Sequence, residues 1–240
     1  MTKDQGKSQK NPREIALDAV MEITQDKQYT HMVLSQILKQ YQYLEKQDRA
    51  FITRICEGTI ERLLTIDYMI NQYSSMKIQK MKPFIRNLLR ISVYQLKYMD
   101  QVPDSAICNE AVKLAKKRGL QNLSGFVNGI LRNMIRYPEK IAFPKEEQDP
   151  IGYLCYTYSM PEWIVKNWLE QYDFQTVKGM LEASLEKKST TIRCNLSKVS
   201  IKELKQMLEQ AGVSVESGAY LPYALRIDKY NYLNDLEPFQ

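Results

Sequence analysis

Apolar residues recur at three- and four-residue intervals through the first 137 positions, which predicts a bundle of α-helices. Asn11 followed by Pro12 is typical of a helix start, Thr65 can cap the fourth helix, and Gly119 can end the sixth. Residues 1–10 offer little to bury, so we expect a disordered arm there. The expected helices cover residues 12–25, 32–40, 45–64, 66–73, 83–98, 104–118 and 122–135.

The pattern changes after residue 137. Three prolines between positions 138 and 150 predict a linker over residues 138–158. Ser159 and Glu162 then have the spacing of a capping box ahead of a helix, and a second helix is expected over 174–186. Period-two alternation at 190–195, 213–216 and 225–228, around a helical pattern at 200–210, predicts a small α/β unit.

The predicted fold class is therefore mainly α. A helical bundle over 11–137 is followed by the linker, and a helical connector with the small α/β domain, similar to an RNA-recognition fold, occupies 159–240. A chain of 240 residues is long enough for two such domains.

Positive charge is concentrated in one part of the chain. Residues 77–136 contain twelve basic and three acidic residues, a local charge of +9, whereas the whole chain carries +6. Charge gathered in one folded stretch indicates a face that binds a polyanion.

A basic stripe is predicted on the helix over 83–98, where Lys82, Arg86, Arg90 and Lys97 share one arc opposite the apolar side. Because no acidic residue interrupts it, we favour a surface that contacts phosphates over an ordinary solvated face. For Lys116 and Lys117 in the next helix, RNA contact and stabilisation of the helix C-terminus are equally good interpretations. The candidate RNA-binding residues are Lys82, Arg86, Arg90, Lys97, Lys113, Lys117, Arg132 and Arg136.

Two glycines lie four residues apart in the helix over 122–135. Gly125 and Gly129 each cost helix stability, roughly 1 kcal/mol against alanine, so a close approach should offset them. Close packing of another helix is the favoured explanation, and approach of an RNA backbone is the alternative.

The sequence offers few residues for metal binding, disulfide bonds or catalysis. The four cysteines are far apart and His31 is the single histidine, which favours buried reduced thiols over a zinc site or a disulfide framework. No acid, base, metal-ligand or nucleophile constellation marks an active site, so no catalytic residue is assigned. The chain has no run of eighteen apolar residues and no apolar leader at its start, so a cytoplasmic location without membrane contact is expected.

The run IRNLLRISVYQLKYMDQVPDSAICNEAVKLAKKRG, followed by FVNGILRNMIR, resembles the all-helical domain of the antitermination factor NusB. It also resembles the copy of that domain at the N-terminus of bacterial 16S ribosomal RNA cytosine-C5 methyltransferases. YSMPEWIVKNWLEQY and TTIRCNLSKVSIKELKQMLEQAG look like the region that joins this domain to the catalytic domain. Arg193 and Asn195 match the family's arginine-x-asparagine motif, with an RNA contact and a structural role both open.

The resemblance implies a role in RNA binding. The catalytic domain of these enzymes binds S-adenosylmethionine through a glycine-rich loop and uses cysteines in proline-cysteine and threonine-cysteine settings, and neither pattern occurs here. We therefore expect an RNA-binding N-terminal part that does not methylate alone, with S-adenosylmethionine as the cofactor of the full-length enzyme only. The expected partner is small-subunit ribosomal RNA. A protein-binding adaptor with a ribosomal protein partner, or an antitermination factor, is the alternative.

Overall fold

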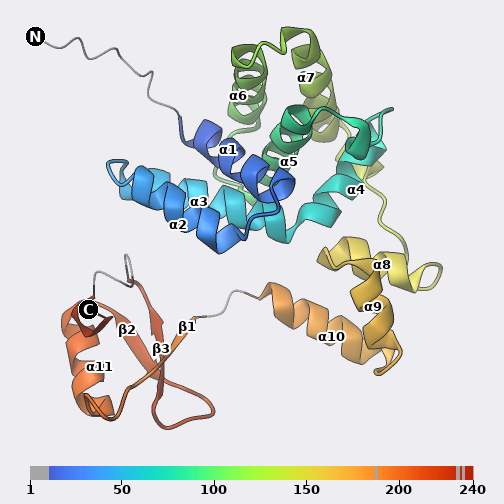
Figure 1. Ribbon diagram of the computed structural model, residues 1–240. Helices are drawn as coiled ribbons and strands as arrows, with labels where there is room; N and C mark the ends of the chain where they lie inside the picture. Colours follow the sequence, from blue (N-terminus) through green and yellow to red (C-terminus); the bar gives the residue numbers. More distant parts are fainter. Residues whose placement is uncertain (1–10, 187–188, 231–232, 234–235, 240) are drawn as a thin grey trace, which may run out of the picture. The chain divides into compact units, whose positions relative to one another are not determined.

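The computed structural model describes residues 11–186, 189–230, 233 and 236–239, and the arm expected at residues 1–10 lies outside them. The chain divides into two compact units, with the boundary between Ala183 and Ser184. The first unit is helical and the second contains a small sheet (Figure 1). Within the described residues, no helix is both long and apolar enough to cross a membrane.

The helices of the first unit agree closely with the predicted ones. Asn11 caps the first helix by accepting a 2.9 Å hydrogen bond from the Glu14 N–H, as expected. Gly119 follows the sixth helix with a φ of +70°, a conformation that favours glycine. The helices are α1 (Pro12–Gln25), α2 (Thr30–Gln40), α3 (Lys46–Glu61), α4 (Leu63–Tyr73), α5 (Pro83–Tyr98), α6 (Asp104–Lys117), α7 (Gln121–Arg136), α8 (Pro150–Tyr158), α9 (Glu162–Leu169) and α10 (Phe174–Leu185), with short 3₁₀ helices η1 (Ile78–Lys80) and η2 (Pro138–Lys140).

Helix α5 is the centre of the bundle, with α1, α3, α4, α6 and α7 packed around it (Figure 1). Most of its apolar residues are buried, and so are several polar ones that bond within the protein. Gln95, for example, donates to the Ile91 carbonyl at 2.9 Å and accepts from Arg13 Nε at 2.8 Å. The predicted bounds of α5 are right. The predicted basic stripe opposite its apolar side is wrong at Arg90, which is buried, whereas Lys82 is exposed and Arg86 and Lys97 are partly exposed.

Gly58 of α3 makes the tight packing against α5 possible. A Cβ atom at this position would lie 2.1 Å from the ring of Tyr94 of α5, which is itself largely buried. We expect Gly58→Ala to lower the free energy of unfolding by about 1–3 kcal/mol, because the ring must move out of a packed core. Gly129→Ala is the matched control, since nothing lies within 4 Å of its added Cβ, and it should stabilise α7 by about 0.5–1 kcal/mol. Urea unfolding of both variants measures the difference, and equal effects would contradict this packing argument.

The segment between α3 and α4 corrects two predictions. The helix expected to run to residue 64 ends at Glu61, and α4 begins at Leu63. Thr65 is consequently inside α4 instead of capping it, and its hydroxyl donates to the Tyr156 carbonyl of α8 at 2.7 Å. This contact between distant segments cannot be read from helical periodicity.

The expected linker over 138–158 contains helix α8, which packs against α4. Leu154 and Cys155 of this helix are buried. The predicted capping box at Ser159 is also wrong: Ser159 adopts a left-handed conformation (φ 59°) after α8, and its hydroxyl accepts from the Leu64 N–H at 3.1 Å. The hydroxyl is therefore occupied by α4, and α9 begins at Glu162 without a side-chain cap.

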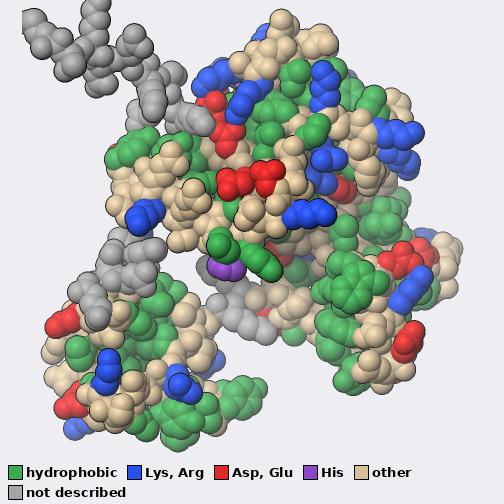
Figure 2. Space-filling model, in the orientation of Figure 1, with side chains coloured by type: hydrophobic (Ala, Val, Ile, Leu, Met, Phe, Trp, Pro, Cys, Tyr) green, Lys and Arg blue, Asp and Glu red, His purple; other side chains and the backbone are tan. Residues whose placement is uncertain are grey.

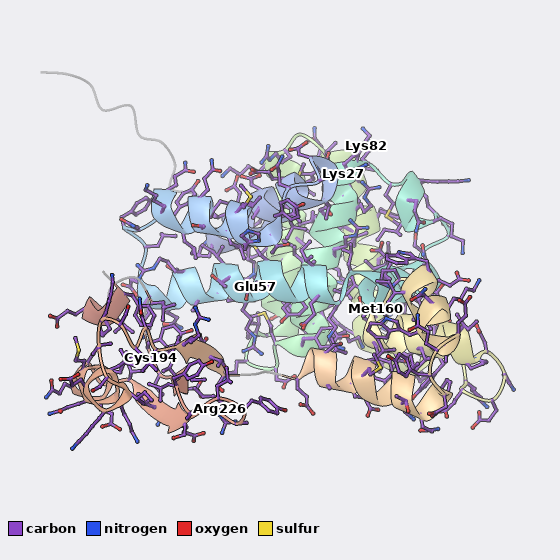
Figure 3. All side chains as sticks on the ribbon, turned by 60° about the horizontal axis from the view of Figure 1, so that its bottom comes forward. Lys27, Glu57, Lys82, Met160, Cys194 and Arg226 are labelled. Carbon is purple, nitrogen blue, oxygen red and sulfur yellow. The ribbon has the colours of Figure 1, made fainter. Side chains whose placement is uncertain are left out.

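The second unit confirms the small α/β prediction. Strands β1 (Thr190–Arg193), β2 (Ser214–Ser217) and β3 (Ala224–Asp228) form an antiparallel sheet in the order β1-β3-β2, and helix α11 (Ile201–Gln210) precedes β2. Ser200 and Glu203 form a capping box at the start of α11. Cys194, Leu208 and Ile227 belong to the core of this unit, and Figure 3 places Cys194 within it and Arg226 on the sheet. A short 3₁₀ helix, η4 (Glu237–Phe239), follows.

Candidate nucleic-acid interface

The structure separates the eight predicted RNA-binding residues by whether their charge is already neutralised. Arg90 is the clearest correction, because its side chain is only 9% exposed and forms a bidentate ion pair with Asp67. Nε and Nη2 donate to the two carboxylate oxygens at 2.7 and 2.6 Å, while Nη1 donates to Asn87 Oδ1 at 2.9 Å. The prediction that Arg90 belongs to an exposed stripe is therefore wrong.

Two predicted contacts on α6 are paired with acidic residues. Lys117 Nζ lies 2.7 Å from the nearly buried carboxylate of Glu14, and Lys113 Nζ lies 2.8 Å from Glu110. The next residue, Arg118, pairs with Asp18. Lys117 and Arg118 thus connect α6 to α1, a structural role that the sequence did not indicate.

Five exposed cations, in the connection from α4 to α5 and in the second half of α7, have no acidic partner among the described side chains. We call them the cationic corner: Lys77, Lys80, Lys82, Arg132 and Arg136. Figure 2 shows Lys and Arg side chains spread over the helical unit, and Figure 3 labels Lys82 at the start of α5. Lys77 and Lys80 were counted in the charge of the stretch but were not among the predicted site residues.

The ends of α4 and α7 position this corner. Tyr73, the last residue of α4, donates its hydroxyl to the Tyr137 carbonyl just after α7, at 2.5 Å. Burial, and then the nearby carboxylate of Glu139, raise the pKa of Tyr73, so the phenol keeps the proton that this bond requires. Both helices present their C-terminal ends here, and the negative end of a helix dipole stabilises cations such as Arg136.

The remaining two predicted contacts are intermediate cases. Arg86 and Lys97 are partly exposed on α5, and neither has an acidic partner in the described part of the chain. The Nε of Arg86 is buried without a hydrogen-bond partner. Arg132, in the cationic corner, donates to Asn128 Oδ1 at 3.1 Å one turn earlier, which leaves its charge uncompensated.

The glycines of α7 do not support the favoured expectation. Gly125 and Gly129 are exposed, and a Cβ added to either would have nothing within 4 Å. Close packing of another helix is therefore not the reason for these glycines. They leave two exposed positions of α7 without a side chain, seven and three residues before Arg132.

Reactive groups are absent from the corner. The four cysteines are free and buried, and burial raises the pKa of Cys56 to about 12 and that of Cys155 to about 11, so both remain protonated thiols near neutral pH. His31 is exposed in α2, with its ring 5.8 Å from that of Tyr29. No group of three or more histidine, cysteine or acidic side chains able to hold a metal ion occurs among the residues described.

In the second unit, Arg193 and Asn195 lie beside a depression of about 410 Å³. Asn195 Oδ1 accepts from the N–H of Ser197 at 3.2 Å and from its hydroxyl at 2.7 Å, which fixes the turn after β1. Asn195 therefore has a structural role, whereas the side chain of Arg193 is exposed.

Two family models match the chain. Residues 10–136 match the model described as the NusB family, and residues 160–233 match the model of the RsmF/B-like methyltransferase ferredoxin-like domain. These two matches confirm the resemblance found in the motifs.

The most similar proteins include the probable ribosomal RNA small subunit methyltransferase B of Bacillus subtilis, 34% identical over 90% of this chain and 48% of that protein. The protein of the same name from Synechocystis is 31% identical over the same shares. A crystal structure titled PH0851 has a TM-score of 0.66 and 16% identity, and covers 98% of this chain and 52% of its own, so it supports the fold alone. The chain thus spans about half the length of the curated relatives it matches. With more than half of its residues in the matched helical domain, the chain belongs to the NusB family.

Proposed function

We propose that this chain is the RNA-binding portion of a small-subunit ribosomal RNA cytosine-C5 methyltransferase, and that it holds RNA at the cationic corner. The observation that carries the proposal is the set of five exposed, unpaired cations on a NusB-family scaffold, where other cations of the same stretch are neutralised. The proposed role is binding and positioning, whereas methyl transfer and S-adenosylmethionine binding are left to a catalytic domain of the kind that the resemblance implies.

The chemistry of the corner supports RNA as the ligand. Exposed lysines and arginines bind phosphates by charge, and such contacts position a nucleic acid without reading its sequence. Target choice would then depend on the shape of the RNA and on its unpaired bases. The relatives named as small-subunit methyltransferases support ribosomal RNA as the class of substrate.

A protein-binding adaptor would use a different surface. Exposed apolar and aromatic side chains are the usual anchors of a protein interface, and Tyr29, Met32 and Tyr43 provide them at α2. The RNA proposal and the adaptor alternative therefore predict different residues at the interface.

Fluorescence anisotropy across a salt series tests the proposal. We expect the chain to bind a small-subunit ribosomal RNA hairpin with an affinity that falls steeply as salt rises, because phosphate contacts release counterions. An unrelated hairpin of equal length should show a similar salt dependence and weaker binding. Absence of binding to both hairpins at physiological salt would contradict the proposal and favour the adaptor.

A further inference from the structure

A pocket of about 400 Å³ lies in the first unit between α4, the connection that contains η1, and α8. Its volume is within the usual range for pockets that bind small organic groups. Lys77 lines the pocket and also belongs to the cationic corner. The pocket therefore opens where we expect an RNA backbone to pass.

One wall of the pocket is aromatic. The rings of Tyr68 and Tyr156 are stacked with centroids 4.1 Å apart and planes inclined by 25°. Tyr68 also stacks on Phe143 at 5.6 Å, and its hydroxyl donates to the Ala142 carbonyl at 3.1 Å, so the ring is held from two sides. Such a fixed stack offers a flat π surface to a planar ligand.

The other walls are polar and suit the edge of a base. Asn71 accepts from the Ile78 N–H at 2.8 Å through Oδ1, an orientation that leaves its Nδ2 as a donor for a ligand. Gln79 is exposed and offers both a donor and an acceptor. Asp67 also lines the pocket, but the bidentate pair with Arg90 neutralises it, so it would not repel RNA.

We propose that this pocket binds an unpaired nucleobase of the RNA, stacked on the ring of Tyr156 that Tyr68 supports from behind, while Lys77 contacts an adjacent phosphate. The inference rests on the proposed function and adds to it a place where single-stranded RNA is distinguished from a duplex. A paired base cannot enter, because its edge is occupied by its partner and its faces by its neighbours in the helix. Helix α8 supplies Tyr156 and lies outside the residues matched by the NusB model, so the pocket requires both parts of the first unit.

Photochemical crosslinking identifies the residues that lie next to the bound base. A ribosomal RNA hairpin that carries iodouridine in its loop is bound to the full chain and irradiated, and the crosslinked peptide is identified by mass spectrometry. We expect the crosslink at Tyr156 or Tyr68, and none when the iodouridine is paired in the stem. Iodouridine monophosphate is tested in parallel, because a free nucleotide has the same base chemistry.

Tyr156→Leu keeps an apolar side chain but removes the ring. It should weaken binding of the loop hairpin by about tenfold and leave the slope of affinity against salt unchanged. The matched control is Tyr43→Leu, which removes an exposed tyrosine that also lies against another ring, and it should leave the affinity unchanged.

Each contrary outcome has a distinct meaning. Salt-dependent RNA binding with crosslinks elsewhere, or with equal affinity for Tyr156→Leu, would overturn the pocket and leave the proposed function intact. A crosslink to Tyr156 by the free nucleotide that equals the hairpin's would overturn the assignment to RNA. Absence of any RNA binding would overturn the inference together with the proposed function.

Discussion

Replacing Arg90 with leucine should lower the free energy of unfolding of the first unit by about 3–5 kcal/mol. The guanidinium is almost wholly buried and holds both oxygens of Asp67, whose side chain is only 13% exposed. Without Arg90, this carboxylate would remain in the protein interior without a compensating charge, and Asn87 would lose a hydrogen bond. Urea unfolding followed by circular dichroism measures the loss.

Two further variants separate the ion pair from simple loss of charge. Lys113→Leu removes a cation that is paired with Glu110 at the surface, and it should change stability by less than about 1 kcal/mol. The double variant Asp67→Leu/Arg90→Leu should recover much of the stability, because a matched apolar pair leaves no buried charge. If Arg90→Leu instead kept the stability of the parent and lost RNA affinity, Arg90 would be a phosphate contact, as the sequence suggested.

The second large effect is expected on RNA affinity. Neutralising Lys82, Arg132 and Arg136 together as Lys82→Gln/Arg132→Gln/Arg136→Gln should weaken hairpin binding by roughly 10–100-fold, if each phosphate contact contributes about 0.5–1 kcal/mol. The slope of log affinity against log salt should fall by about 2–3, close to one for each lost contact. Stability should change little, since all three side chains are exposed.

A matched triple variant controls for net charge. Lys113→Gln/Lys166→Gln/Lys205→Gln also removes three positive charges, but each of these lysines is paired with a glutamate one turn away. We expect its affinity and salt slope to stay close to those of the parent. Equal losses in the two triple variants would show that binding depends on overall charge, and would contradict a localised cationic corner.

The bounds of the helices followed from periodicity, capping residues and proline positions, as α5 and the cap at Asn11 show. The burial of polar side chains on α5 could not be predicted from the sequence, because the amphipathic pattern of a helix assigns its polar residues to solvent. Asn87, Arg90 and Gln95 are buried because their partners come from α1 and α4, which lie far away in the sequence. Nothing local in the sequence pairs Arg90 with Asp67.

The candidate site was predicted in part. The charge of the stretch indicated a cationic surface, but the sequence could not show that Glu14 and Glu110 neutralise Lys117 and Lys113. It also could not place Tyr156 on Tyr68, because that stack joins α4 to a segment that its prolines marked as a linker. Lys77 and Lys80 could have been predicted as site residues, since no acidic residue occurs between positions 68 and 99.

Lysine protection by RNA tests the central claim most directly. The chain is acetylated with and without a ribosomal RNA hairpin, and the modified lysines are quantified by mass spectrometry. We predict that RNA slows acetylation of Lys77, Lys80 and Lys82, and leaves Lys166 and Lys205, which are paired with glutamates, unchanged. Equal protection at all five lysines, or protection only in the second unit, would contradict RNA binding at the cationic corner.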